Sequence, residues 1–154
     1  MVIIKNFINL IFKIFNYKII KIVDQFSNSF RLVLSFKEKN IDYVLDVGAS
    51  EGQFVKELRY YGYNGKILSF EPILSAHKKL LNNSMNDDNW NVFEPIALGN
   101  KNSESILNIS KNSVSSSLLK INDEHLDNAP ESRFIDKQKT QQRKLEDIFS
   151  DFQI

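Results

Sequence analysis

The pattern of apolar and polar positions places a strand, a helix and a second strand near the middle of the chain. Tyr43–Val47 is a short apolar run, typical of a strand buried on both faces. Lys66–Phe70 predicts a second strand after a loop at residues 62–65. The helix expected between the strands has one apolar face, formed by Phe54, Val55, Leu58 and Tyr61.

Further elements follow this unit. Residues 75–81 predict a helix, and residues 82–89 a polar loop. Residues 90–98, 105–109 and 140–145 predict strands, with residues 146–152 as a loop or short turn. The polar segment at residues 120–139 is interrupted by Pro130 and carries no predicted element.

Residues 1–40 are expected to form a separate region of amphipathic helices. In residues 1–23, apolar side chains recur at helical spacing and the only charges are lysines. The longest uncharged stretch there has seven residues, whereas a membrane span needs about 20. Two interpretations remain open: the helix packs on the domain or on a partner, or it lies on an anionic membrane surface. Residues 23–39 predict a second helix, whose inward residues are Phe26, Phe30, Val33 and Leu34.

The composition of the chain excludes several kinds of binding site and partner. The chain has 154 residues, 42% of them apolar, so residues 41–154 are expected to form one domain with a real core. A net charge of +1 gives no overall attraction to nucleic acid. The chain contains no cysteine, which excludes disulfides and thiolate zinc sites, and we predict no metal site. No secretory leader is recognisable, so a cytoplasmic protein is expected, with the N-terminal helix as its potential membrane contact.

Candidate chemistry lies where the first two strands end. Gly48 and Gly52 bracket a turn, and glycine lets a ligand approach the main chain closely. Glu71 ends the second strand, where a carboxylate can accept hydrogen bonds from both ribose hydroxyls of an adenosine. The G-x-x-x-G spacing differs from the G-x-G-x-x-G of dinucleotide sites, which disfavours a nicotinamide-dependent oxidoreductase. The spacing suits S-adenosylmethionine, which has no pyrophosphate; a purely structural turn is the alternative.

Several segments resemble the FkbM-type methyltransferases. Residues 46–54, D-V-G-A-S-E-G-Q-F, resemble their first motif, D-V-G-A-N-x-G-x-F, with Ser50 in place of the usual Asn. Residues 69–72 match their S-F-E-P, and residues 97–99, after Trp90, resemble their third-strand region. The serine-rich residues 109–118 and the closing residues 144–148 are similar too, with Glu146 in place of an Asp. The resemblance covers residues 42–149 in one continuous order.

The resemblance implies an α/β fold with a Rossmann-like class I methyltransferase sheet that binds S-adenosyl-L-methionine. The implied reaction is O-methylation of a sugar or another hydroxylated small molecule. Asp46 and Gly48 are expected at the methionine end, Glu71 at the ribose, and Pro72, Ala97 and Leu98 at the adenine. The full set of expected cofactor-binding residues is Asp46, Gly48, Ala49, Ser50, Gly52, Glu71, Pro72, Ala97 and Leu98.

The sequence identifies no catalytic base. His77 is interpreted either as an exposed helix residue or as a group near the adenosine. His125 is interpreted either as an exposed loop residue or as the acceptor of a hydroxyl proton. Residues 112–118 form either a surface loop or a segment folded over the cofactor pocket.

In the family, the following strand carries K-I-D-x-x-G-x-E, and this chain has no such motif. We therefore expect a sheet that is incomplete toward the C-terminus and leaves an apolar edge on the strand Tyr43–Val47. An alternative function follows: an inactive remnant, or one half of a split methyltransferase, that binds a partner chain which completes the sheet.

Overall fold

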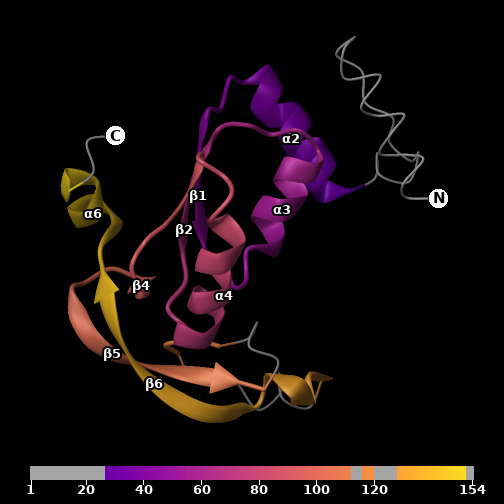
Figure 1. Cartoon of the computed structure of the whole chain (residues 1–154). Coiled ribbons are helices and arrows are strands. Elements are labelled where there is room, and N and C mark those ends of the chain that lie inside the picture. The colour runs from indigo at the N-terminus through magenta and orange to yellow at the C-terminus, as the bar shows by residue number, and fades with distance from the viewer. Residues whose placement is uncertain (1–26, 112–115, 120–127, 152–154) are drawn as a thin grey trace.

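The computed structural model describes residues 27–111, 116–119 and 128–151. Several predictions concern residues outside these ranges: the helix at residues 1–23, Phe26, residues 112–115 and His125. The chain is a mixed α/β protein with two small sheets (Figure 1). Its elements are α2 (Asn28–Glu38), β1 (Tyr43–Val47), α3 (Gln53–Tyr60), β2 (Lys66–Phe70), α4 (Leu74–Ser84), β3 (Trp90–Val92), β4 (Ile96–Leu98), β5 (Ser103–Ser110), the 3-10 turn η2 (Pro130–Ser132), β6 (Phe134–Arg143) and α6 (Leu145–Asp151).

The first sheet is parallel and has the order β1-β2-β3. The register aligns Asp46 with Ser69 and Ile67 with Trp90. The bounds predicted for β1 and β2 are confirmed. The burial predicted for β1 is wrong, because Asp46 is its only buried side chain. Within the described residues β1 is an edge strand: it pairs with β2 on one side, and no strand pairs with its other edge.

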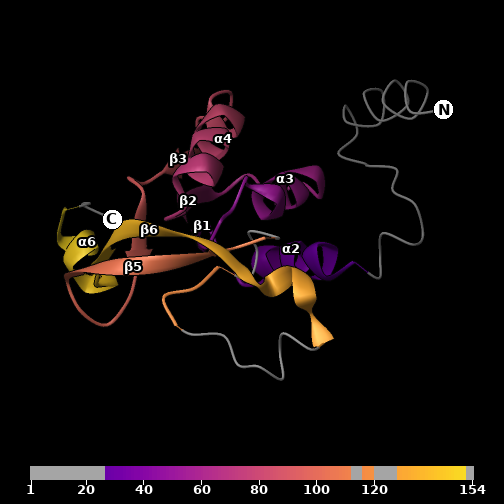
Figure 2. The same cartoon turned by 90° about the horizontal axis from the view of Figure 1, so that it is seen from below.

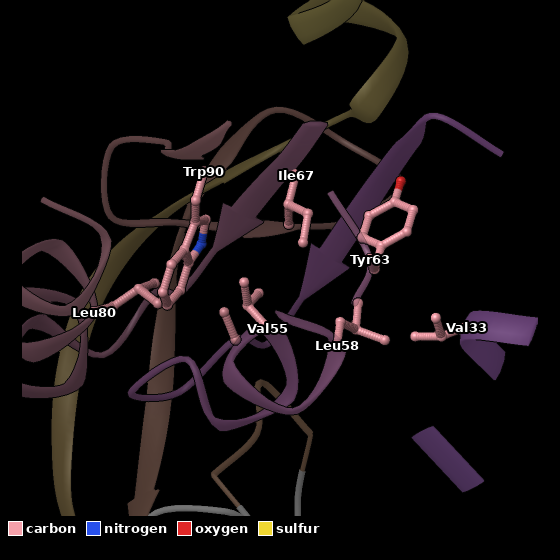
Figure 3. Close-up of a cluster of buried hydrophobic side chains, with 8 residues drawn as sticks. Val33, Val55, Leu58, Tyr63, Ile67, Leu80 and Trp90 are labelled. Carbon is pink, nitrogen blue, oxygen red and sulfur yellow. The ribbon is translucent and has the colours of Figure 1, made fainter. Parts of the chain in front are cut away.

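Helices α2, α3 and α4 lie on one side of β1 and β2, and α6 lies on the other (Figure 1). Strands β5 and β6 cross from the α6 side, past the ends of β1 and β2, to the start of α4. The helical side holds the larger apolar cluster, in which Leu80 and the Trp90 ring pack near Val55 and Leu58 (Figure 3). On the opposite face, Leu68 and Phe70 pack with Ile96 of β4 and Ile148 of α6. The central strand β2 is thus covered on both faces.

The second sheet has the order β4-β6-β5, with β4 parallel and β5 antiparallel to β6. Figure 2 shows β5 and β6 side by side. The single strand predicted at residues 90–98 is therefore wrong. The Phe93 N–H still donates to the Ser69 carbonyl at 2.9 Å, after which the chain leaves the first sheet. Pro95 lies at the break and has no N–H to continue a ladder, so β4 pairs with β6 instead.

Several other elements differ from their predicted bounds, and β5 extends the predicted strand at both ends. Helix α4 continues to Ser84, into the predicted polar loop. Strand β6 begins at Phe134, before its predicted start. These residues are too polar to show an apolar alternation, and their antiparallel pairing with β5 stabilises the strand instead. Residues expected as a loop form α6, whose Ile148 is buried against the first sheet.

The helix predicted at residues 23–39 is present as α2, but among the described residues it begins only at Asn28, because Ser27 is extended, and it ends at Glu38. One of its inward positions is wrong. Val33 is buried, whereas Leu34 is 51% exposed because it lies on the outer face of the helix. No helix in the described ranges has the length and apolar character that crossing a membrane requires.

Candidate functional site

Two adjoining hollows, of about 130 and 270 Å³, lie where β1 and β2 end. Ligand pockets usually measure about 300–1,000 Å³, so the two together reach the lower end of that range. The residues common to both hollows are Gly48, Pro72, Leu107 and Ser116. The smaller hollow is also lined by Ser50, Glu71 and Ile73. The larger one is also lined by Val47, Phe70, Ile96, Ala97, Leu98, Ser117 and Leu118.

Most of the residues expected to bind a cofactor meet at these hollows. Those that line them are Gly48, Ser50, Glu71, Pro72, Ala97 and Leu98. Asp46, Ala49 and Gly52 line neither hollow. Ala49 belongs to the apolar cluster on the helical side, so only its backbone can face a ligand.

The turn at residues 48–52 folds back over the end of β2. The N–H groups of Gly48 and Ala49 both donate to the Phe70 carbonyl, at 2.9 and 3.0 Å. Gly48 has φ +75°, and Ser50 is also left-handed at φ +51°. A residue with a side chain pays about 1–2 kcal/mol for that conformation, and Asn, the residue of the resembling motif, adopts it more readily.

Gly52 has a packing role. It is the N-cap of α3, with φ +85°. A Cβ atom added there would lie 2.4 Å from the Trp90 ring. The glycine thus allows α3 to start directly against the indole, as close helix–strand packing requires.

Glu71 is buried, 4% exposed, and links the turn to the segment after β2. Its Oε2 accepts the Ser50 N–H at 2.7 Å, and its Oε1 accepts the Ile73 N–H at 2.8 Å. Burial raises the pKa of this carboxyl; the two backbone N–H groups and His77 oppose that rise, and Asp46 adds to it. Each carboxylate oxygen keeps a second lone pair, which a ligand hydroxyl in the smaller hollow could use.

Asp46 lies in a buried polar chain beneath the turn. The Trp90 Nε1–H donates to Ser69 Oγ at 2.9 Å, and the Ser69 hydroxyl donates to Asp46 Oδ2 at 3.0 Å. Burial raises the pKa of Asp46, and the bond from Ser69 opposes that rise. Its contact with the methionine end of a cofactor stays a prediction.

His77 is buried on α4, so its interpretation as an exposed helix residue is wrong. Its Nε2 lies 2.6 Å from the Phe93 carbonyl oxygen. A carbonyl can only accept, so this nitrogen carries a proton and donates it. His77 thereby ties α4 to the break between β3 and β4, and it lines neither hollow.

The sequence did not identify the apolar side chains with which β5 lines the hollows. Leu107 of β5 is 3% exposed and lines both hollows. Its signal was the alternation of the predicted strand, which places it on the inner face. Ser117 pairs with Asn108 through two backbone hydrogen bonds of 2.9 and 3.0 Å. The end of the serine-rich segment is thus held along β5 at the wall of the larger hollow.

Among the described residues, no three His, Asp or Glu side chains are placed to hold a metal ion. Comparison of the chain with protein-family models, with curated proteins and with solved structures gave no match.

Proposed function

We propose that the chain binds S-adenosyl-L-methionine where β1 and β2 end and transfers its methyl group to a hydroxyl of a sugar or other hydroxylated small molecule. The observation that carries this proposal is the placement of Glu71. Glu71 directly follows the central parallel strand β2 and lines a hollow beside the glycine turn. Open α/β sheets bind nucleosides in this place, and the FkbM resemblance with its Rossmann-like sheet implies the same.

The residues at the hollows suit the parts of such a cofactor. Glu71 would accept hydrogen bonds from the ribose hydroxyls, while backbone N–H groups already fix its orientation. Pro72, Ala97 and Leu98 offer an apolar wall for the adenine. Gly48 leaves room for the methionine end, because nothing lies within 4 Å of where its Cβ would be.

The cofactor supplies a methyl group already activated on a sulfonium, so the chain's contribution would be positioning donor and acceptor in line. The proposal therefore needs a bound, oriented ribose more than it needs a strong base. The acceptor's hydroxyl proton has no assigned recipient among the residues that line the hollows.

Calorimetric titration with S-adenosylhomocysteine tests this proposal. We expect micromolar binding by the wild-type chain and at least about tenfold weaker binding by Glu71→Gln, because a hydrogen bond to a charged group contributes about 1.5–3 kcal/mol. Glu104→Gln, an exposed carboxylate on β5, is the control and should leave binding unchanged. Circular dichroism checks that each variant is folded. Absence of binding by a folded wild-type chain would refute the proposal.

A second candidate function is a partner-binding module, favoured by the outer edge of β1. Within the described ranges no strand pairs with that edge, and Val47 is 58% exposed beside it. A strand from another chain could pair there and complete the sheet. Light scattering of the purified chain tests the simplest case, pairing between two copies. A dimer that does not bind S-adenosylhomocysteine would favour this candidate, and a monomer at all concentrations would exclude self-pairing.

A further inference from the structure

One side chain of the second sheet holds the segment that follows Glu71. Gln138 of β6 donates from Nε2 to the Pro72 carbonyl at 2.6 Å, and its Oε1 accepts the Leu74 N–H at 3.1 Å. Leu74 is the first residue of α4, and the N-cap residue, Ile73, makes no side-chain capping bond. The first N–H groups of a helix have no partner within the helix, so Gln138 satisfies one of them from outside. The side-chain amide of Gln138 thus forms hydrogen bonds at both ends of the segment of residues 72–74.

The middle of the same segment is bound to Glu71. The Ile73 N–H donates to Glu71 Oε1 at 2.8 Å, and the Ile73 carbonyl accepts the His77 N–H at 2.8 Å. Pro72 and Ile73 both line the smaller hollow. Any shift of this backbone would therefore move a wall of the hollow and change the aim of the carboxylate.

The sheet register holds Gln138 in place for this contact. Gln138 is paired with Leu107, the buried residue that lines both hollows. Gln141 of the same strand faces the other way, is exposed, and bonds Glu104 at 3.3 Å. The paired strands β5 and β6 therefore contribute a wall through Leu107 and a backbone contact through Gln138.

We propose that Gln138 is a positioning residue of the proposed cofactor site: it fixes residues 72–74 and, through the Ile73 N–H, orients Glu71 toward the ribose. The inference rests on the proposed function and adds to it. Gln138 lines neither hollow, so it acts through the backbone and not by touching the ligand.

Two variants and one control test the inference. Gln138→Ala removes both hydrogen bonds. Gln138→Met removes them too but keeps the length and most of the packing of the side chain. Gln141→Ala, on the exposed face of the same strand, is the matched control. For each, calorimetry measures affinity for S-adenosylhomocysteine, and NMR hydrogen exchange measures protection of the Leu74 amide in the free chain.

We expect Gln138→Ala and Gln138→Met to weaken binding on the order of tenfold, because without the two neutral hydrogen bonds residues 72–74 would hold their binding geometry in only a fraction of the free molecules. The Leu74 amide should exchange faster in both, while amides paired between β5 and β6 keep their protection. The control should match the wild type in both measurements. Recovery of affinity by Gln138→Met would show that packing alone matters and would overturn the inference.

The remaining outcomes separate the two proposals. Unchanged Leu74 exchange, or faster exchange with unchanged affinity, would refute the positioning role alone. A wild-type chain that does not bind S-adenosylhomocysteine would refute the proposed function and this inference with it.

Discussion

β1 and β2 are neighbouring parallel strands of five residues each, yet they are buried to very different degrees. In β2 every residue after Lys66 is buried, whereas in β1 only Asp46 is buried and Val47 is 58% exposed. β2 pairs with both β1 and β3, and in the described ranges β1 pairs only with β2. The position of a strand in its sheet, more than its own run of apolar residues, decides how deeply it is buried.

The two strands also share a polar contact inside the helical face. Each strand places one polar residue there, Asp46 and Ser69, and the register makes them direct neighbours. Trp90 of β3 completes the chain by donating to Ser69. The edge strand is therefore joined to the sheet interior by this polar contact as well as by its backbone pairing with β2 and by the partly buried Val44 and Leu45.

Truncation of one side chain in each strand gives the largest contrast. Ile67→Ala in β2 removes a side chain with no exposed surface and should lower the free energy of unfolding by about 2–5 kcal/mol. Val47→Ala in β1 should change it by less than about 0.5 kcal/mol, because the side chain is largely exposed. Urea unfolding measures both. Equal losses would show that something covers β1 as fully as β2.

Removal of the central hydroxyl tests the polar chain between the strands. Ser69→Ala leaves the Trp90 N–H and one Asp46 oxygen without their partner, which should cost about 1–3 kcal/mol. Ser75→Ala, exposed on α4, is the control and should be nearly neutral. A loss no larger than the control's would mean that the chain of hydrogen bonds adds no stability.

The pH dependence of stability provides a smaller effect. Because burial raises the pKa of Asp46 in the folded chain, the folded state binds that proton more tightly than the unfolded state does. The contribution of Asp46 to stability is thus highest below its unfolded pKa of about 4 and falls as pH rises through the folded pKa. Asp46→Asn should remove this fall, while the similar fall from Glu71 remains. Urea unfolding at pH 4 to 8 measures the difference, and parallel curves for the two chains would contradict it.

The smallest expected effect is a difference in hydrogen exchange between backbone amides of β1, and it needs no mutation. The Gly48 N–H donates to the Phe70 carbonyl, and bonds alternate along a parallel strand, so the N–H groups of Tyr43, Leu45 and Val47 point away from β2. These three should exchange with solvent much faster than the amides of Val44 and Asp46 in NMR hydrogen exchange. Protection of Leu45 equal to that of Ser69 in β2 would indicate a strand paired with the β1 edge and would favour the partner-binding function.

The bounds of β1 and β2 could be predicted because the chain marks them locally: a polar step precedes β1, glycine-containing turns lie between the two strands, and Glu71 and Pro72 follow β2. Their burial could not, since it depends on β3, β4 and α6, which are distant in sequence. The break within the predicted third strand did have a local signal in Pro95. The first part of strand β6, residues 134–139, had none, because polar side chains occupy most of its positions on both faces, and only residues 140–143 fell within a predicted strand.

In the candidate site, too, the residues marked by local motifs could be predicted, and those that depend on distant elements could not. Glu71, Pro72 and Gly48 were predicted from motifs at strand ends, and they do line the hollows. The contacts of Gln138 with Pro72 and Leu74 could not be predicted, because they depend on the crossing of β6 over the start of α4. His77 was misjudged because helical spacing does not show that the bend after β3 covers it.

The contact between Trp90 and Gly52 has a practical consequence. Trp90 is the only tryptophan in the chain, and its ring lies against the last residue of the turn at residues 48–52. All indole fluorescence of the protein therefore originates at one buried point directly beneath that turn. A ligand that displaces the turn would shift the emission, so the chain carries an intrinsic optical reporter for titration in solution without an added label.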